Sequence, residues 1–315
     1  MELNKIIFGD NLTILKEFPS DSIDLVYLDP PFFTQTDWTK NGYKFEDKFE
    51  SIEDYLNFLR IRLLELHRVL KPTGTIYLHC DYRTHHYFRI EMDKIFKNYQ
   101  TTIHWRRFSV PHGCKANKIF PEISEYILVY TKTKEYNYNI QYTPHQEGYI
   151  NDFKNPDNDP NGIYVWARTM KGTKLSRNAK ELNEKSDIKF LNISSSGKWT
   201  YKRYWEDHYE GEKFVKGQKY GKKISNIWTD ISKGMTAKEL IYPTQKPEKL
   251  LERIIKASSN PGDIVLDPFC GSGTICVVAK KLGRNYIGID QSEDAVKLTE
   301  ERLDKIIIPK SLWDD

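Results

Sequence analysis

Residues 263–273 read Asp-Ile-Val-Leu-Asp-Pro-Phe-Cys-Gly-Ser-Gly, an apolar run that ends in a glycine-rich turn. The run Ile264-Val265-Leu266 predicts a buried strand, because continuous apolar residues suit a strand covered on both faces. The glycines predict a tight loop that opens a helix over residues 272–282. A second strand over 286–290 and a second helix over 292–306 follow. This repeat of strand and helix is typical of the α/β class.

The N-terminal part of the chain continues the same rhythm. Two strands form too small a sheet to be stable alone, so the C-terminal pair must join strands from elsewhere. We therefore expect one sheet built from both ends of the chain, with parallel strands and helices on both faces. The clearest helix begins with Ser51 and Asp54 as a capping pair and carries leucines at steps of three and four. The predicted N-terminal elements are strands at 5–8, 23–28, 75–78, 101–108 and 126–131 and helices at 11–18, 51–70 and 84–97.

Residues 141–240 break this rhythm with loop-forming residues such as Asn155-Pro156. They hold 18 Lys and Arg against 13 Asp and Glu, a net charge of +5 in a chain whose net charge is +4. We interpret the segment as an insertion in a domain formed by residues 1–140 and 241–315, and a solvated basic surface is the alternative reading. Four tryptophans interleave with the cations, as occurs where protein meets phosphates and bases. These are Trp166, Trp199, Trp205 and Trp228.

The composition of the whole chain excludes several classes of protein. With 315 residues the chain is long enough for one large domain plus an insertion. No run approaches the roughly 18 apolar residues of a membrane span, so we expect a soluble, intracellular protein without a membrane partner. The four cysteines lack paired metal-ligand spacing, so neither a disulfide framework nor a bound metal is expected. They are Cys80, Cys114, Cys270 and Cys276.

The glycine turn has the features of a site for a nucleotide-like ligand. Glycines let the backbone approach a ligand closely, and the start of the helix near Ser272 presents free N–H groups. Asp290 ends the next strand, about 20 positions further on, where an acidic residue accepts hydrogen bonds from ribose hydroxyls.

A second turn, Asp29-Pro30-Pro31-Phe32, follows the strand at 23–28. The two prolines stiffen this turn and lack N–H donors, so the Asp29 carboxylate and the Pro30 carbonyl converge as acceptors. Such a pair can hold both hydrogens of an exocyclic amine and localise the nitrogen lone pair for attack on a methyl group. Phe32 would stack on the base. Taken alone, the tetrapeptide is also explained by a simple turn that ends a strand.

Together the two turns resemble the motifs of the permuted β-class of S-adenosylmethionine-dependent DNA amino-methyltransferases. The order, with the Asp-Pro-Pro-Phe turn first and the glycine turn last, is that of this class, and matched segments cover roughly the first 130 and the last 75 residues. The resemblance implies a Rossmann-like α/β sheet, circularly permuted in motif order, with an inserted target-recognition region over 141–240. It also implies S-adenosyl-L-methionine as the cofactor rather than NAD.

The resemblance also assigns residues. Asp10 and Asn11 stand where the family places a carboxylate against the adenine amine of the cofactor, although a turn after Gly9 also explains Asp10. Residues 242–247, Tyr-Pro-Thr-Gln-Lys-Pro, match the family's (H/Y)PTQKP box, in which Thr and Lys face the cofactor's carboxylate; a helix-start lysine is the alternative. The implied catalytic residues are Asp29, Pro30, Pro31 and Phe32. The implied cofactor-binding residues are Asp10, Asn11, Thr244, Lys246, Asp267, Pro268, Phe269, Cys270, Gly271, Ser272, Gly273, Thr274 and Asp290.

The implied activity is methylation of the N6 amine of a flipped adenine in double-stranded DNA at a short specific sequence, in a restriction-modification system or as a solitary enzyme. Cytosine N4 methylation is the alternative, favoured in the family by Ser-Pro-Pro-Tyr. A non-catalytic DNA-binding subunit, or a methyltransferase acting on RNA or protein, is a further one. Relatives imply a homodimer and leave open a cognate restriction endonuclease. Phe33, Trp38 and Trp105 could line the base pocket, although core packing is the commoner role of such residues.

Overall fold

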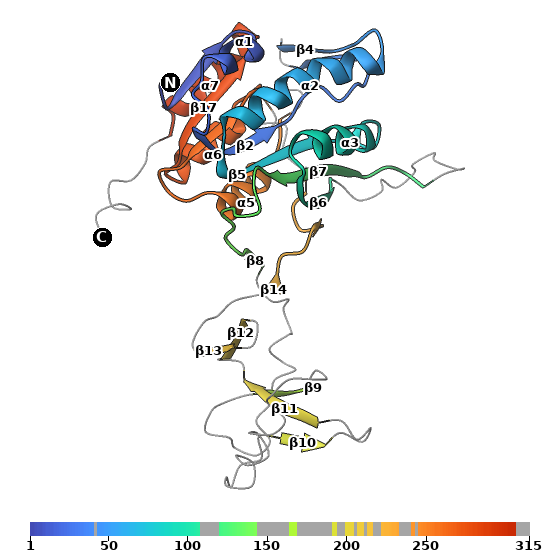
Figure 1. Ribbon diagram of the computed structural model, residues 1–315, viewed down its shortest axis with the longest axis vertical. Coiled ribbons are helices and arrows are strands. Elements are labelled where there is room, and N and C mark those ends of the chain that lie inside the picture. Colours follow the sequence, from blue (N-terminus) through green and yellow to red (C-terminus); the bar gives the residue numbers. More distant parts are fainter. Residues whose placement is uncertain are drawn as a thin grey trace. The chain divides into compact units, whose positions relative to one another are not determined.

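The computed structural model contains a mixed eight-stranded sheet flanked by helices (Figure 1). It describes residues 1–40, 43–107, 120–143, 164–168, 191–193, 199–204, 207–210, 213–216, 222–232, 241–242 and 245–306. In sheet order, the strands are β1 (Lys5–Phe8), β17 (Asn285–Asp290), β16 (Ile264–Asp267), β2 (Ile23–Leu28), β5 (Leu70–Cys80), β7 (Ser124–Thr131), β6 (Asn98–Arg106) and β15 (Ile227–Trp228). The helices are α1 (Asn11–Lys16), α2 (Ile52–Val69), α3 (His85–Ile95), α5 (Glu248–Ser258), α6 (Thr274–Lys281) and α7 (Glu293–Asp304).

The strand order brings the two ends of the chain into one sheet, as expected. The C-terminal strands β17 and β16 lie between the N-terminal strands β1 and β2, and all of these neighbours are parallel. Phe8 lies opposite Asp290, and Leu266 lies opposite Val26. Because parallel strands end at the same edge of a sheet, the turns that follow these four strands gather in one place.

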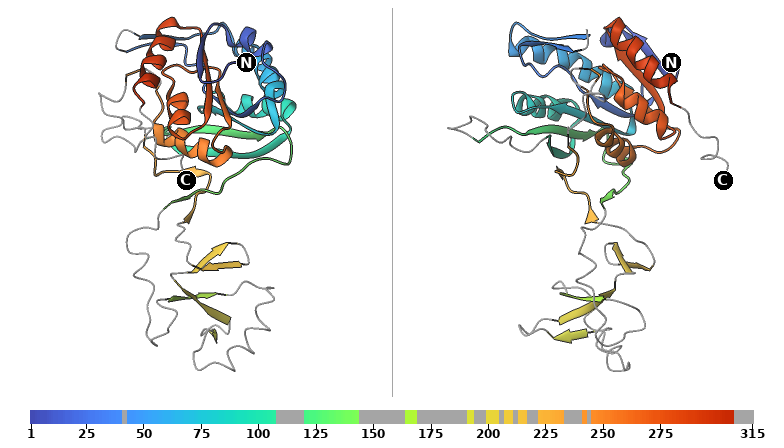
Figure 2. Two further views of the ribbon diagram at one scale, coloured as in Figure 1. Left: turned by 90° about the vertical axis from the view of Figure 1, so that its left-hand side faces the viewer. Right: turned by 180° about the vertical axis from the view of Figure 1, so that it is seen from behind.

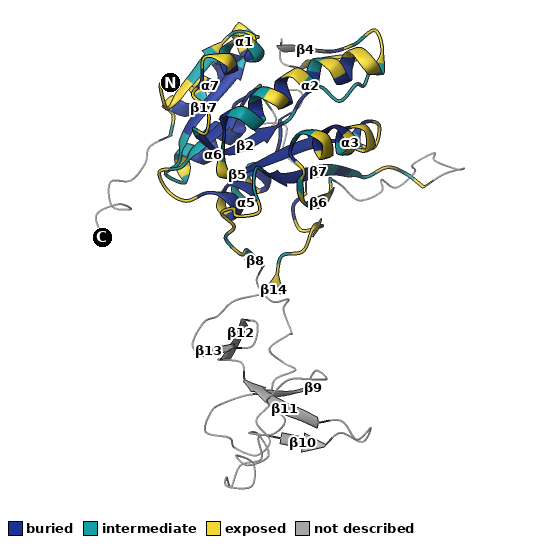
Figure 3. Cartoon of the chain, viewed as in Figure 1, coloured by how far each residue is buried: buried dark blue, intermediate teal, exposed yellow. Residues whose placement is uncertain are grey.

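Alternating side chains on β2 divide the core between the two faces of the sheet. Val26 and Leu28 pack in a cluster with residues of α1, α2 and α3, whereas Leu25 and Tyr27 pack in a second cluster with residues of α5 and α6. Figure 2 shows the helices on both sides of the sheet, and Figure 3 shows that buried residues concentrate on the strands between them. A strand buried on both faces explains why the sequence of β2 reads as a nearly continuous apolar run.

The strand β7 departs from the expected parallel arrangement. It runs antiparallel to both of its neighbours, β5 and β6. The ladder between β6 and β7 continues to Arg107, whose N–H donates to the Ile123 carbonyl at 3.0 Å. Arg106, which ends β6, lies opposite Ser124, which begins β7, and this register makes the two strands antiparallel. The expectation of parallel strands throughout is therefore wrong for β7.

The helix α2 confirms the predicted capping pair. The Ser51 hydroxyl accepts a hydrogen bond from the Asp54 N–H at 3.1 Å, which satisfies one of the free donors of the first turn. Before α2, the chain forms a short hairpin of β3 (Thr36–Lys40) and β4 (Tyr43–Asp47), which the sequence did not predict. Among the described helices, none is long and apolar enough to cross a lipid bilayer.

The chain divides into two compact units, residues 1–141 with 224–315, and residues 142–223. The insertion boundary predicted at 240 is therefore wrong, because residues 224–232 belong to the first unit. There β15 pairs with β6, and Trp228 is buried in the core instead of joining the basic, aromatic segment. Residues 142–223 still hold 16 Lys and Arg against 11 Asp and Glu. Their described strands are β8 (Tyr142–Thr143), β9 (Tyr164–Arg168), β10 (Leu191–Ile193), β11 (Trp199–Tyr204), β12 (Asp207–Glu210), β13 (Lys213–Lys216) and β14 (Lys222–Lys223).

Candidate active site

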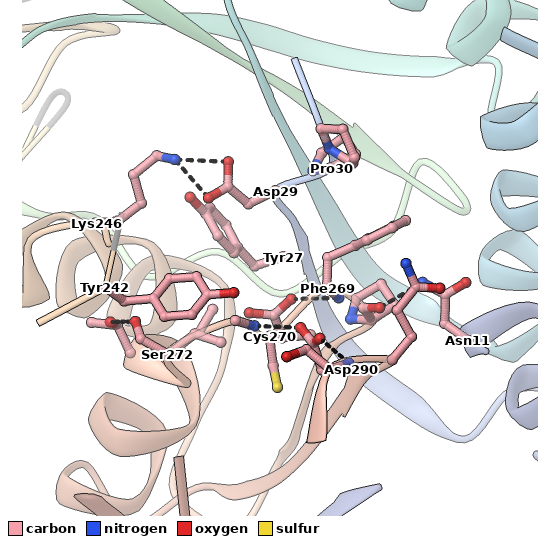
Figure 4. Close-up of a pocket in the computed structure, with 18 of the residues that line it drawn as sticks. Asn11, Tyr27, Asp29, Pro30, Tyr242, Lys246, Phe269, Cys270, Ser272 and Asp290 are labelled. Atoms are coloured by element: carbon pink, nitrogen blue, oxygen red, sulfur yellow. Dashed lines mark hydrogen bonds and ion pairs between the residues drawn. The ribbon is translucent and has the colours of Figure 1, made fainter. Parts of the chain in front are cut away.

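A cavity of about 620 Å³ lies where β1, β2, β16 and β17 end. A volume of this size suits a small-molecule ligand. The turns after all four strands contribute to its wall, together with α2 and the segment before α5. Figure 4 shows the principal lining residues, with the Asp29 turn on one side and the glycine turn on the other.

The glycine turn connects β16 to α6 and contains a hydrogen bond within its own backbone. The Gly273 N–H donates to the Cys270 carbonyl at 2.7 Å, and Gly273 adopts a left-handed conformation, with φ of 67°. It caps α6 without a side-chain hydrogen bond, so the first turn of the helix keeps N–H groups for a ligand. Asp267 is buried at the start of the turn and accepts from the Phe269 N–H at 3.0 Å. Burial raises the pKa of the Asp267 carboxyl well above its ordinary value.

Asp290, at the end of β17, joins its own turn to the glycine turn. Its carboxylate accepts the N–H of Gly271 at 2.8 Å and the N–H of Ser292 at 2.9 Å. Burial raises the pKa of Asp290, and these two N–H groups act in the opposite direction. The carboxylate lines the cavity while it fixes the turn, so it can accept a further hydrogen bond from a ligand hydroxyl.

Asp10 and Asn11 occupy the third turn, at the start of α1. Asp10 caps the helix through the Thr13 N–H and pairs with Arg62 of α2 at 2.6 Å. Burial favours a higher pKa for Asp10, but Thr13 and Arg62 outweigh it, and the pKa is lowered. Asn11 donates to the Pro268 carbonyl at 2.6 Å and accepts from Arg62 at 2.6 Å, so it connects this turn to the glycine turn. Asp10 therefore caps α1 and also lines the cavity.

Asp29 lies at the end of β2, on the opposite wall. Both of its carboxylate oxygens accept from the Lys246 ammonium, at 2.9 and 2.6 Å (Figure 4). The same ammonium lies 5.0 Å from the centre of the Phe32 ring, a cation–π distance. Lys246 thus joins the (H/Y)PTQKP-like box to the Asp-Pro-Pro-Phe turn, a contact that the sequence motifs did not reveal.

A buried polar chain lies behind Asp29. His79 is fully buried, and its Nδ1 lies 2.7 Å from the Tyr27 hydroxyl and 3.9 Å from Asp29. On its other side His79 Nε2 lies 2.9 Å from Glu125, whose second oxygen pairs with Arg107 at 2.5 Å. Burial opposes the charge on Glu125, but His79, Lys246 and Arg107 together lower its pKa. The chain lies beside Asp29 inside the sheet, and sequence spacing gave no signal for it.

The predicted site residues gather at one place in the described structure. All of them line the cavity except Gly273, which lies behind it at the start of α6, and Thr244, which falls outside the described residues. Phe33 packs on Tyr55 and Phe49, and Trp105 is buried with its indole N–H bonded to the Ile231 carbonyl, so both have the core role. Nothing is described of the Trp38 side chain. The aromatic lining that the sequence missed includes Tyr27, Phe49 and Phe58.

Comparisons with known proteins agree with this geometry. The family model described as a DNA methylase, for the N6 and N4 enzymes, matches residues 23–301. The chain is 30% identical over 307 residues to the DNA adenine methyltransferase YhdJ of Escherichia coli (strain K12), covering 96% of this chain and 83% of that protein. It is 29% identical over 311 residues to the Type II methyltransferase M.BglII of Bacillus subtilis, covering 96% and 69%.

Two solved structures show the same fold at lower identity. TTHA0409 from Thermus thermophilus, in a complex with S-adenosyl-L-methionine, matches with a TM-score of 0.53 and 21% identity, covering 95% of this chain and 92% of that one. The cytosine-N4-specific PvuII DNA methyltransferase matches with a TM-score of 0.52 and 18% identity, covering 96% and 87%. These likenesses show the fold, and the fold alone does not determine which base is methylated.

Proposed function

The chain belongs to the N6/N4 DNA methylase family, and we propose that it methylates the N6 amine of adenine in double-stranded DNA at a specific sequence. The observation that carries the proposal is the Asp29 carboxylate at one wall of a cavity whose opposite wall is the glycine turn. Methyl transfer requires a methyl donor on one side of the cavity and, on the other, a site that binds the amine to be methylated.

The residues present fit S-adenosyl-L-methionine. The open N–H groups at the start of α6 suit the negative end of a ligand, and Asp290 can accept a ribose hydroxyl. Asp10 and Asn11 stand at the far end of the cavity, where an adenine amine needs acceptors. When bound, the cofactor supplies an electrophilic methyl group on a sulfonium.

The Asp-Pro-Pro-Phe turn then prepares the amine. Asp29 accepts one amine hydrogen and the Pro30 carbonyl accepts the other, which localises the nitrogen lone pair toward the methyl carbon. Phe32 stacks on the base, which must leave the duplex to reach this depth. The Lys246 ammonium places a positive charge beside Asp29 and complements the negative charge of its carboxylate.

Adenine is the proposed base because the turn reads Asp-Pro-Pro-Phe, the form associated in the family with N6 methylation, and because the relative YhdJ is an adenine methyltransferase. Methylation of cytosine N4 is the second candidate, because the matched family model covers both the N6 and the N4 enzymes. A non-catalytic DNA-binding subunit is disfavoured because both turns are complete.

Product analysis tests the proposal. DNA lacking modified bases is incubated with the protein and methyl-labelled cofactor, digested to nucleosides, and separated by chromatography with mass detection. The label is expected in N6-methyladenine. Label in N4-methylcytosine would move the assignment to the second candidate, and the Asp29→Ala protein, purified in parallel, controls for a contaminating enzyme.

The unit of residues 142–223 is proposed to be the target-recognition region, inserted into a permuted methyltransferase domain. Its excess of cations is the support, because phosphate contacts dominate affinity for DNA. The Ile224 N–H donates to the Gln141 carbonyl at 2.9 Å, so an Asn-Gly turn can replace the unit without displacing its neighbours. The shortened protein is expected to bind cofactor and to lose sequence preference, and retained preference would contradict the proposal.

The partners follow from the same family likeness. Double-stranded DNA is the proposed substrate, and a homodimer and a cognate restriction endonuclease are the proposed protein partners. Light scattering of the purified protein tests the first association, because a dimer doubles the scattering mass. A restriction challenge of DNA modified by the protein tests the second.

A further inference from the structure

A carboxylate outside both sequence motifs holds the Asp29 turn. Asp47, the last residue of β4, is almost fully buried, with 1% of its surface exposed. Its Oδ1 accepts the Phe33 N–H at 2.8 Å. Its Oδ2 accepts the N–H groups of Phe32, at 3.1 Å, and Thr34, at 3.0 Å, and also the Thr34 hydroxyl at 2.7 Å. Four donors from three successive residues thus converge on one side chain.

The chemistry of the turn explains why this contact matters. Pro30 and Pro31 have no N–H, so the first backbone donors after Asp29 are those of Phe32, Phe33 and Thr34. Asp47 takes all three. Phe33 and Gln35 have φ of 57°, a left-handed conformation that non-glycine residues rarely adopt unless the surroundings impose it.

The carbonyl side of the turn is held separately. The fully buried Tyr55 of α2 donates its hydroxyl hydrogen to the Pro31 carbonyl. Among the described residues, none donates to the Pro30 carbonyl, and Pro30 lines the cavity. Asp47 and Tyr55 therefore fix the residues on the C-terminal side of the two acceptors assigned to the target amine.

We propose that Asp47 is a positioning residue for methyl transfer: its carboxylate sets the place of the Pro30 carbonyl and of the Phe32 ring. The inference rests on the proposed function, because it assigns Asp47 to the amine-binding side of the reaction. Asp47 touches the turn and not the target base, so it acts through the loop. Removing it should therefore slow transfer while the glycine turn continues to bind cofactor.

The test compares Asp47→Asn with Asp24→Asn. Asp24 is a matched control because it is also buried and also accepts several hydrogen bonds, from Lys71 and from the Ile264 N–H, but at the opposite end of β2. Transfer is measured in a single turnover, with enzyme in excess over a plasmid that the wild-type protein methylates. Cofactor affinity is measured by calorimetry with S-adenosyl-L-methionine, and both are done well below the thermal midpoint of each variant.

An amide offers one acceptor oxygen where Asp47 has two, so at least one N–H of the turn loses its partner. The single-turnover rate of Asp47→Asn is expected to fall by at least about 30-fold, with cofactor affinity within about twofold of wild type. Asp24→Asn is expected to lose stability and to keep its rate within about twofold. A wild-type rate for folded Asp47→Asn would overturn the inference, as would equal loss of rate in both variants.

Two substitutions of Thr34 test the proposed role of Asp47 if the Asp47→Asn variant does not fold. Thr34→Val removes the hydroxyl donor to Asp47, and Thr34→Ser restores it. The Val variant is expected to slow transfer about threefold to tenfold, and the Ser variant to recover most of the rate. Equal rates in the two would overturn the inference. If Asp29→Ala also keeps full activity, the proposed function fails; if Asp29→Ala is inactive while Asp47→Asn is unaffected, only the role of Asp47 fails.

Discussion

Two turns at the ends of neighbouring strands are held in place by different means. The glycine turn, residues 267–273, depends on a left-handed glycine and on a bond within its own backbone, from the Gly273 N–H to the Cys270 carbonyl, and the side chains of Asn11 and Asp290 add to these. The Asp29 turn, residues 29–34, has two prolines and is held by side chains from elsewhere. Its anchors are Asp47 of β4, Tyr55 of α2 and Lys246 before α5.

The difference teaches where each turn is vulnerable. A turn that depends on a left-handed glycine loses its conformation when that glycine is replaced, because few other residues adopt this conformation. A turn that is held by side chains from other segments loses its conformation when those side chains are replaced, although its own sequence motif is unchanged. Under the proposed function, cofactor binding would therefore depend on one turn and amine binding on the other, although both turns border one cavity.

The largest effect on cofactor affinity is expected from Gly273→Ala. A Cβ at this position would lie 2.8 Å from Cβ of the buried Thr299, and φ is 67°, so the change adds a clash to backbone strain. Cofactor affinity is expected to fall by at least about 100-fold, ~2.7 kcal/mol. Gly262→Ala is the control, since it has φ of 89° but no neighbour within 4 Å. Calorimetry giving the same affinity for both variants would contradict the account of this turn.

A smaller effect on the same turn is expected from Asp290→Asn. The N–H groups of Gly271 and Ser292 bond to different oxygens of Asp290, and the amide keeps only one of these acceptors. It also removes the negative charge that would accept a hydrogen bond from a ribose hydroxyl. A contact to a charged acceptor contributes about 1.5–3 kcal/mol, so affinity should fall about 10- to 150-fold. Asp263→Asn, which alters a similar bond to a backbone N–H at the other end of β16, should leave affinity unchanged. Unchanged affinity in Asp290→Asn would remove the ribose assignment.

The smallest effect is expected outside both turns, at Glu91 of α3. This buried carboxylate accepts from Arg60 at 2.6 Å and from Lys94 at 2.8 Å. The hydrogen bond from Arg60 is the main cause that lowers the pKa of Glu91 from 4.5 to about 2. Because the pKa is lower in the folded state, the stabilisation is complete above the unfolded pKa and is lost as the pH falls from about 4.5 toward 2.

Urea unfolding of Glu91→Gln measures this contribution. At pH 7 the variant is expected to be less stable by about 1 kcal/mol, discounted for the partly exposed Arg60, and the difference should shrink at pH 3. Glu252→Gln, whose partner Lys256 is exposed, should show almost no difference at either pH. A difference of constant size at both pH values would mean that Glu91 stabilises the fold through packing and not through charge.

The sequence was most informative where structure depends on neighbours along the chain. The strands around Leu266 and Val26 and the cap at Ser51 were predicted because apolar runs and capping residues act locally. The helix α5 carries a comparable stripe, with Leu250, Ile254 and Ile255 buried, so its pattern was readable although it was not predicted.

Other features depend on contacts between distant segments. The antiparallel direction of β7 is seen only in its pairing with β5 and β6, and β15 has only two residues, too few for a period. The approach of Lys246 to Asp29 joins residues 217 positions apart. The role of Asp47 depends on a hairpin that returns its side chain beneath the Asp29 turn. No local pattern carries such information.

The most direct test of the division between the two turns is a paired measurement on Asp29→Ala. Calorimetry gives its affinity for S-adenosyl-L-methionine, and a single-turnover assay on a plasmid methylated by the wild-type protein gives its transfer rate. The account predicts cofactor affinity within about twofold of wild type and a transfer rate reduced by more than about 1,000-fold, ~4 kcal/mol of barrier. A transfer rate within about tenfold of wild type, or a matching loss of cofactor affinity, would contradict it.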